Sequence, residues 1–302
     1  MNKKLIFYTV ALTAGLLTAC SSDDEQKQEP PVRHISVEVN QRPMTSDDPA
    51  GARSTDTRSA ITTTETFSAF SMRGIYNSLT TNYTVSKSGG IWTVADDKWP
   101  GGSENNNTTP FYAYTDGTFY PNSGTPFIDF TVDEDASKQH DLLVAKNSVA
   151  YSDHAGKVPL TFDHACAALA FNIFMSNTLS VQLGGKLTVT SIVLKNVRNN
   201  GKYYFDTTFN ESTWSDVEGS ADYTLNNSNM EITTTSQELS SNHLFMIPQK
   251  RAATDPDGGI CLEISYTFSG QERTTANIPL TVDWKKSTQY TINIKLGTGL
   301  IQ

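Results

Sequence analysis

The chain has 302 residues and a formal net charge of −9, and 37 % of its residues are hydrophobic and 10 % aromatic. This apolar content is sufficient for the core of one large domain or two ordinary ones. The acidic balance, with no cluster of basic residues, argues against nucleic acid as a partner, because binding to phosphates needs grouped Lys or Arg side chains.

Residues 1–19 are typical of a secretory signal peptide. Two lysines, Lys3 and Lys4, precede an apolar run over residues 5–17, and small residues follow it. A helix needs about 20 apolar residues to cross the hydrocarbon core of a bilayer, so this shorter run is not expected to remain as a membrane span.

The tetrad Leu17-Thr18-Ala19-Cys20 resembles a bacterial lipobox, in which the signal is cut before the cysteine and the cysteine is acylated. Cys20 is therefore the predicted lipid attachment site, and several acyl chains at about 0.8 kcal/mol per methylene give durable membrane attachment. Residues 20–33 then form an acidic tether. Its start, SSDDE, resembles the signal that sends lipoproteins of certain Gram-negative anaerobes to the outer face of the outer membrane. An ordinary secretory signal with a coincidental cysteine is the alternative.

Alternating apolar and polar residues predict half-buried β-strands along the rest of the chain. The first such run, residues 34–40, places Ile35, Val37 and Val39 on one face. Further strand-like runs occupy residues 157–162, 168–175, 187–195, 202–205, 243–248, 260–268 and 289–296. Turn residues separate them, and no window is typical of an amphipathic helix of ordinary length. The pattern predicts an all-β fold of antiparallel β-sandwiches.

Residues 41–60 lack this alternation and are rich in Ser, Thr, Asp, Gly and Pro. We interpret them as an exposed loop or linker between the strand at 34–40 and another that begins near Ile61. Exposed segments of small polar residues are preferred sites of proteolysis, and this one contains Arg42, Arg53 and Arg58.

Residues that could carry chemistry form no catalytic or metal-binding pattern. The five histidines do not fall into His-x-x-x-His spacing. Asp163-His164 could belong to a nucleophilic triad, but the Gly-x-Ser-x-Gly motif is missing. Asp255-Pro-Asp257-Gly begins like a calcium loop and lacks the later acidic ligand, so a hairpin turn is favoured. We predict no catalytic residue, no cofactor and no metal site.

Two cysteines besides Cys20 are present, Cys166 and Cys261. A disulfide between them is possible in an exported protein, and buried free thiols are the other interpretation.

Several motifs in order along the chain resemble the fimbrillin family, the subunits of type V pili. They are the lipobox, residues 57–62 after the polar loop, FYAYTDGTFYP at 111–121, DLLVAK at 141–146, VPLTFDHACAALAFNI at 158–173, and VDWKKSTQYTINIKL at 282–296. The resemblance implies two transthyretin-like β-sandwich domains with Greek-key connections, residues 34–163 and 164–302, and no enzymatic activity. It also implies that aromatic residues such as Trp92, Trp99, Tyr112, Tyr114 and Tyr120 serve mostly in packing, although they could line a sugar platform.

The resemblance further implies assembly by strand exchange. An arginine-specific protease would remove the first strand, with Ile35, Val37 and Val39, and a strand of another pilus subunit would replace it by β-augmentation. Arg58 is the predicted cleavage residue and Arg53 the second choice, so that cleavage at Arg58 gives a chain from Ser59 to Gln302. The alternative is that this loop is never cut.

The expected location is the cell outer membrane, through the lipid, and then the fimbrium. After the last predicted strand only GTGLIQ follows, and six extended residues span about 20 Å. We therefore expect an acceptor-only subunit such as a pilus tip, unless the last strand itself is donated.

A monomeric surface lipoprotein that binds glycan or a host protein is the second functional hypothesis, and a hydrolase is a weaker third. The sequence does not identify the host or bacterial surface ligand.

Overall fold

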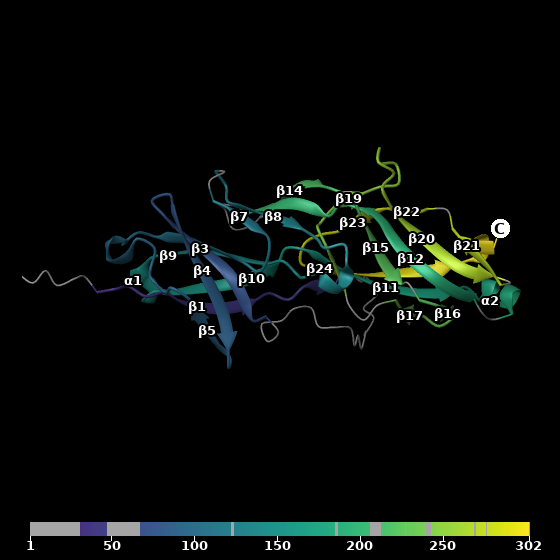
Figure 1. Cartoon of the computed structure of the whole chain (residues 1–302), viewed down its shortest axis with the longest axis horizontal. Coiled ribbons are helices and arrows are strands. Elements are labelled where there is room, and N and C mark those ends of the chain that lie inside the picture. The colour runs from purple at the N-terminus through teal and green to yellow at the C-terminus, as the bar shows by residue number, and fades with distance from the viewer. Residues whose placement is uncertain are drawn as a thin grey trace, which may run out of the picture. The chain divides into compact units, whose positions relative to one another are not determined.

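The computed structural model describes residues 31–46, 67–121, 124–184, 187–205, 213–226, 228–239, 243–268, 270–275 and 277–301 (Figure 1). Val32–Gln302 forms one compact unit. The predicted signal peptide, Cys20, Arg53 and Arg58 lie outside the described residues.

The largest sheet has seven strands in the order β1-β10-β9-β6-β3-β4-β5. Their bounds are Ser36–Gln41 (β1), Lys157–His164 (β10), Leu143–Val149 (β9), Thr109–Tyr114 (β6), Ala69–Tyr76 (β3), Leu79–Ser88 (β4) and Ile91–Val94 (β5). A four-stranded sheet has the order β14-β13-β8-β7. Its strands are Thr213–Glu218 (β14), Asn200–Tyr204 (β13), Phe127–Thr131 (β8) and Thr118–Tyr120 (β7).

Most of the remaining strands form two further sheets. One contains Gln237–Glu238 (β17), Leu244–Met246 (β18), Ala167–Met175 (β11), Thr288–Leu296 (β24) and Thr45–Ser46 (β2). The other contains Ala221–Asn226 (β15), Met230–Ile232 (β16), Leu187–Val197 (β12), Ile260–Phe268 (β20), Gln271–Thr274 (β21) and Ile278–Leu280 (β22). Lys250–Arg251 (β19) pairs with Val282–Asp283 (β23).

Helices are short in the described residues. The α-helices are Tyr151–His154 (α1) and Asn177–Leu183 (α2), and three 3-10 turns cover Gly102–Glu104 (η1), Ala136–Lys138 (η2) and Thr298–Ile301 (η3). Within this described part, no helix has the length and apolar character needed to cross a membrane.

The predicted all-β fold is confirmed, and the longest predicted strands appear close to their expected bounds. The alternating run at 260–268 is β20, and the run at 289–296 is β24, which begins one residue earlier. Most pairs are antiparallel, as predicted. Three described pairs, β1–β10, β11–β24 and β2–β24, are parallel. Their partners are far apart in the sequence, and parallel pairing requires a long connection of this kind in place of a hairpin.

The buried hydrophobic residues form two clusters, each of which is a core packed against the sheets. The first, which we call the N-terminal core, consists of Ile35, Phe67, Phe70, Met72, Tyr83, Val85, Trp99, Phe111, Ala113, Leu143, Ala145, Val149, Val158, Leu160 and Phe162. The larger core gathers side chains from β6, β8, β11, β12, β13, β15, β20 and β24. Alternate residues of β6 serve both: Phe111 belongs to the N-terminal core and Tyr112 to the larger one.

Strands from both sides of the predicted domain boundary at 163/164 share one sheet. β13 pairs with β8, placing Tyr203 opposite Ile128. The division into domains 34–163 and 164–302 therefore stays a prediction, as do the Greek-key connections.

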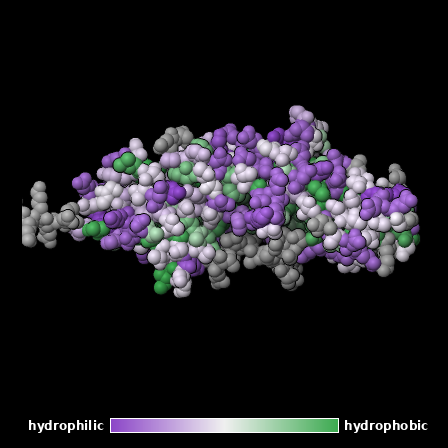
Figure 2. All heavy atoms as spheres, in the orientation of Figure 1, coloured by the Kyte–Doolittle hydropathy of each residue, from purple (hydrophilic) through white to green (hydrophobic). Residues whose placement is uncertain are grey.

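The visible surface is mostly hydrophilic or neutral, with scattered hydrophobic side chains (Figure 2). Among the described residues, the exposed large hydrophobic ones are Val32, Leu79, Ile91, Tyr120, Val181 and Ile278. Single exposed apolar residues of this kind are normal in folded proteins.

Candidate functional site

The candidate site is built around β1, the strand at one end of the seven-stranded sheet. β1 runs parallel to β10, with Ser36 opposite Lys157 and Gln41 opposite Phe162. The residues just before β1 pair with the segment after β5: the Ile35 amide donates to Asp97 O at 2.6 Å, and the Trp99 amide donates to Arg33 O at 2.8 Å. These hydrogen bonds connect the residues before β1, at one end of the sheet, with the residues after β5, at the other end.

The three apolar residues predicted for this strand lie on one face and pack on the N-terminal core. Ile35 is 3 % exposed and belongs to that core. Val37 and Val39 are half-buried and pack against it. Successive strand residues point to opposite faces, so this grouping follows from the spacing of two. Whether the strand is removable remains a prediction.

Gln41 continues the same alternation and is also directed inward. Its Nε2 lies 3.1 Å from Nε2 of His164, the last residue of β10. The other ring nitrogen of His164, Nδ1, is paired with Oδ2 of Asp141. The side chains of His164 and Asp141 are 1 % and 0 % exposed, and burial raises the pKa of Asp141. A polar chain of three side chains thus reaches from β1 into the interior.

An arginine on each side of β1 binds the side chains or backbone of neighbouring segments. Arg33, before β1, donates to Asn105 O at 2.6 Å and to Asn106 Oδ1 at 2.9 Å. Arg42, after β1, donates twice to the Asp163 carboxylate, at 2.9 and 2.8 Å. The Arg42 side chain is 67 % exposed, so solvent screening keeps its contribution small.

The segment continues into a second sheet. Thr45 and Ser46 form β2, which runs parallel to β24, and the Thr45 amide donates to Ser287 O at 2.8 Å. The interpretation of residues 41–60 as loop is therefore wrong for Gln41 and for Thr45–Ser46. These residues lack an apolar alternation because β2 is exposed, and its pairing depends on a partner far away in the chain. Residues 47–60, with both predicted cleavage arginines, lie outside the described part.

The structure separates the residues that could have formed a nucleophilic triad. Asp163 and His164 are consecutive in β10 and point to opposite faces, so Asp163 binds Arg42 while His164 is paired with Asp141. Within the described ranges, no group of three or more His, Cys, Asp or Glu side chains could hold a metal ion. Cys166 and Cys261 are both buried free thiols, which resolves the alternative left by the sequence.

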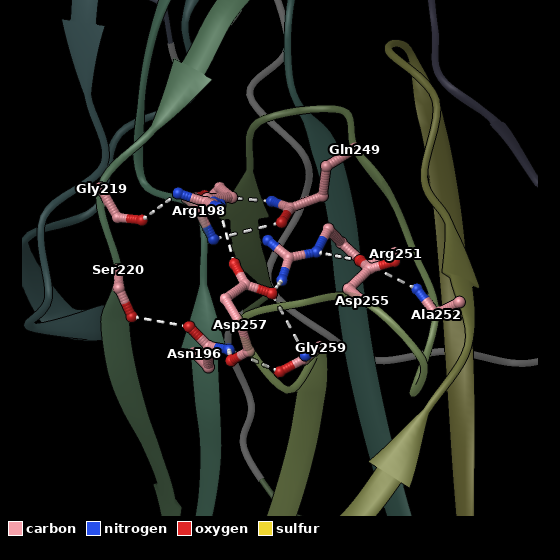
Figure 3. A network of polar contacts seen from close by, with 10 residues as sticks. All are labelled: Asn196, Arg198, Gly219, Ser220, Gln249, Arg251, Ala252, Asp255, Asp257 and Gly259. Carbon is pink, nitrogen blue, oxygen red and sulfur yellow. Dashed lines mark hydrogen bonds and ion pairs between the residues drawn. The ribbon is translucent and has the colours of Figure 1, made fainter.

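The segment 255–259 is a turn whose carboxylates are bound by arginines (Figure 3). Arg251 donates to Asp255 Oδ2 at 2.6 Å and is also paired with Asp257. Arg198 donates to the other oxygen of Asp257 at 2.6 Å. Arginine side chains therefore bind both acidic residues of the apparent calcium motif, as expected if this segment is a structural turn.

The aromatic residues noted in the sequence are mainly packing residues. Trp99, Tyr112 and Tyr114 are buried, and Trp92 packs against Phe67 and Phe70. Tyr120 differs because 44 % of it is exposed.

Tyr120 also begins an aromatic ladder that no local pattern of the sequence indicates. Its ring stacks on Phe127 with centroids 4.8 Å apart, and Phe127 lies 5.1 Å from Tyr204. The three rings come from β7, β8 and β13, side by side in the four-stranded sheet. Only the pairing of these strands brings the rings together.

The sequence matches the profile of the family described as fimbrillin-like over residues 42–302. No curated protein is detectably similar. Among solved structures, a fimbrial protein from Bacteroides vulgatus has a TM-score of 0.58 at 16 % identity, over 87 % of this chain and 95 % of that chain. A proposed cell adhesion protein from Parabacteroides distasonis has a TM-score of 0.52 at 11 % identity, over 87 % and 88 % of the two chains.

A further proposed cell adhesion protein, from Bacteroides eggerthii, has a TM-score of 0.50 at 12 % identity, over 89 % of this chain and 88 % of that chain. At such identities these likenesses concern the fold alone. The profile match, in contrast, covers most of the sequence. The chain belongs to the fimbrillin-like family.

Proposed function

We propose that this protein is a subunit of a cell-surface pilus and that a strand from another subunit replaces β1 during assembly. As a member of the fimbrillin-like family it is a non-enzymatic protein, and the fimbrial and cell adhesion proteins that share its fold support a role in a fimbrium. The observation that carries the exchange mechanism is that β1 is an edge strand whose inward side chains complete the N-terminal core.

Loss of β1 would leave two defects in the same place. The edge of β10 would lose its backbone partners, and the core residues Val158, Leu160 and Phe162 beside it would lose their cover. A strand with alternating apolar residues repairs both defects, whereas a loose apolar peptide repairs only the second.

The proposed route begins with export and acylation at Cys20, which anchors the chain on the outer membrane. An arginine-specific protease then cuts after Arg58, or after Arg53 as the second choice. The cut frees the segment that contains β1 from the rest of the chain, and a partner subunit supplies the replacement strand.

We further propose that this subunit accepts a strand and does not donate one. β24 is paired with β11 over eight residues and with β2 at its start, and its Ile294 and Leu296 are buried. Withdrawal of β24 would therefore open the sheet that it helps to form. A tip position in the pilus fits this arrangement.

The decisive experiment treats the purified chain, with Cys20→Ser to prevent acylation, with an arginine-specific protease. We expect a single new N-terminus at Ser59, which Arg58→Ala abolishes and the control Arg53→Ala leaves in place. The cut chain should then bind a labelled peptide of residues 31–46, whereas the uncut chain should not. Absence of peptide binding to the cut chain would refute strand exchange, and long filaments formed by the pure cut chain would refute the acceptor-only role.

A second candidate function, glycan binding, is favoured by the ladder of the exposed Tyr120 and the half-buried Phe127 and Tyr204. Aromatic rings presented side by side offer apolar faces on which sugar rings can lie. The test measures glycan-array binding of the intact chain against Tyr120→Ala. Loss of a signal in this variant but not in the exposed control Val181→Ala would support glycan binding, and an array without signal would exclude it for the glycans tested.

A further inference from the structure

The inward face of β1, together with Ile35 just before it, presents three apolar side chains and then an amide. Ile35, Val37, Val39 and Gln41 occupy alternate positions and share one face of the strand. A fourth apolar residue would bury more apolar surface than glutamine. The polar amide at this position therefore indicates a specific polar partner in the groove, by which we mean the site beside β10 that β1 fills.

That partner is the ring of His164. Gln41 Nε2 lies 3.1 Å from His164 Nε2, and the ring is held from its other side by Asp141. His164 and Asp141 belong to β10 and to the residues just before β9, both of which stay in the acceptor when β1 leaves. The polar end of the groove is therefore a permanent part of the acceptor.

An amide suits this end of the groove better than other side chains. It offers both a donor and an acceptor, so it can pair with Nε2 of His164 whether that nitrogen carries a proton or a lone pair. A leucine would leave the buried nitrogen without a partner. A glutamate would bring a second carboxylate into a buried site that already contains Asp141.

We propose that the groove selects its incoming strand by an amide at the fourth inward position. The replacement strand, from another pilus subunit, would carry apolar residues at the positions of Ile35, Val37 and Val39 and a glutamine at the position of Gln41. This inference rests on the proposed strand exchange and adds to it a polar criterion that rejects purely apolar strands.

The test uses the protease-cut full chain and labelled peptides of residues 31–46, with affinity measured by fluorescence anisotropy. Gln41→Leu in the peptide should weaken binding roughly tenfold to hundredfold because a buried polar group loses its partner. Gln41→Glu should weaken it at least as much. The matched control is Asn40→Leu, the same change of amide to leucine at the adjacent exposed position, which should leave affinity within about twofold.

The outcomes separate the two proposals. Because every variation is in the peptide, folding of the acceptor is the same throughout. Equal or tighter binding of the Gln41→Leu peptide would overturn the selection of an amide and leave strand exchange intact. Failure of every peptide, including the unaltered one, would overturn strand exchange and with it this inference.

Discussion

The backbone of Gly156 lies directly against the carbonyl oxygen of His34: a Cβ atom on Gly156 would be 2.2 Å from it. Gly156 also has a φ of +81°, which L side chains rarely adopt, and its carbonyl accepts the Ser36 amide at 2.9 Å. The close approach of β1 to the start of β10 therefore requires glycine at this position.

Gly156→Ala should destabilise the protein by about 2 kcal/mol or more, because it adds a steric clash to the cost of a positive φ. The matched control is Gly90→Ala: Gly90 has a φ of +84° but nothing within 4 Å of an added Cβ, so only about 1 kcal/mol is expected. Denaturant unfolding measures both values. Hydrogen exchange at the Ser36 amide should accelerate only in Gly156→Ala, and equal losses of stability would contradict the proposed contact.

Acylation of Cys20 should place the exported precursor in the outer-membrane fraction. Mass spectrometry of the precursor is expected to find the mature N-terminus at Cys20 with lipid on this residue, whereas Cys20→Ser should release unacylated protein. An unmodified N-terminus at any other residue would show that the lipobox is not used.

Cys166 and Cys261 should behave as buried thiols. Burial raises the pKa of both, well above the usual value for Cys166, and the reactive species is the thiolate. In a Cys20→Ser background we expect neither thiol to react with a thiol reagent near neutral pH, and both to react in denaturant. A protein mass lower by two hydrogens before reduction would instead indicate a disulfide.

Asp257 should stabilise the turn shown in Figure 3 in a pH-dependent way. Burial raises its pKa, but hydrogen bonds from Arg251 and Gly259 and the charges of Arg251 and Arg198 outweigh burial, so its pKa lies below the usual value. A carboxyl whose pKa is depressed by folding contributes stability above its unfolded pKa of about 4 and loses it as the pH falls through its folded pKa.

Asp257→Asn should therefore lower the melting temperature at pH 7, and the difference from the parent protein should shrink toward pH 3. The control is Glu272→Gln on β21, where the side chain is exposed and a smaller difference at pH 7 is expected. A difference that does not vary with pH would mean that the charge of Asp257 is not what stabilises the turn.

Strands with one buried face could be predicted from the alternation of apolar residues in the sequence, and β6, which is buried on both faces, could not. β20 and β24 show an apolar residue at every second position, which is a local signal. β6 reads TPFYAY, and its side chains serve the two cores on opposite sides, so no alternation marks it as a strand.

The same distinction applies to the candidate site. The spacing of Ile35, Val37 and Val39 predicted their shared face. Gln41 extends that spacing, so its inward direction could have been predicted from the sequence. Its partner could not, because Gln41 and His164 are 123 residues apart, and Asp141 and His164 are 23 apart.

The sequence by itself predicted an export signal, and it determined the all-β class and the apolar face of the first strand, because each depends on residues close together in the chain. Tertiary structure alone decided that β1 lies at the edge of its sheet, that Thr45–Ser46 pairs with β24, and that a buried histidine meets Gln41. Those contacts join segments whose separation in sequence carries no periodic signal, and they form only when burial of the cores has brought the sheets together.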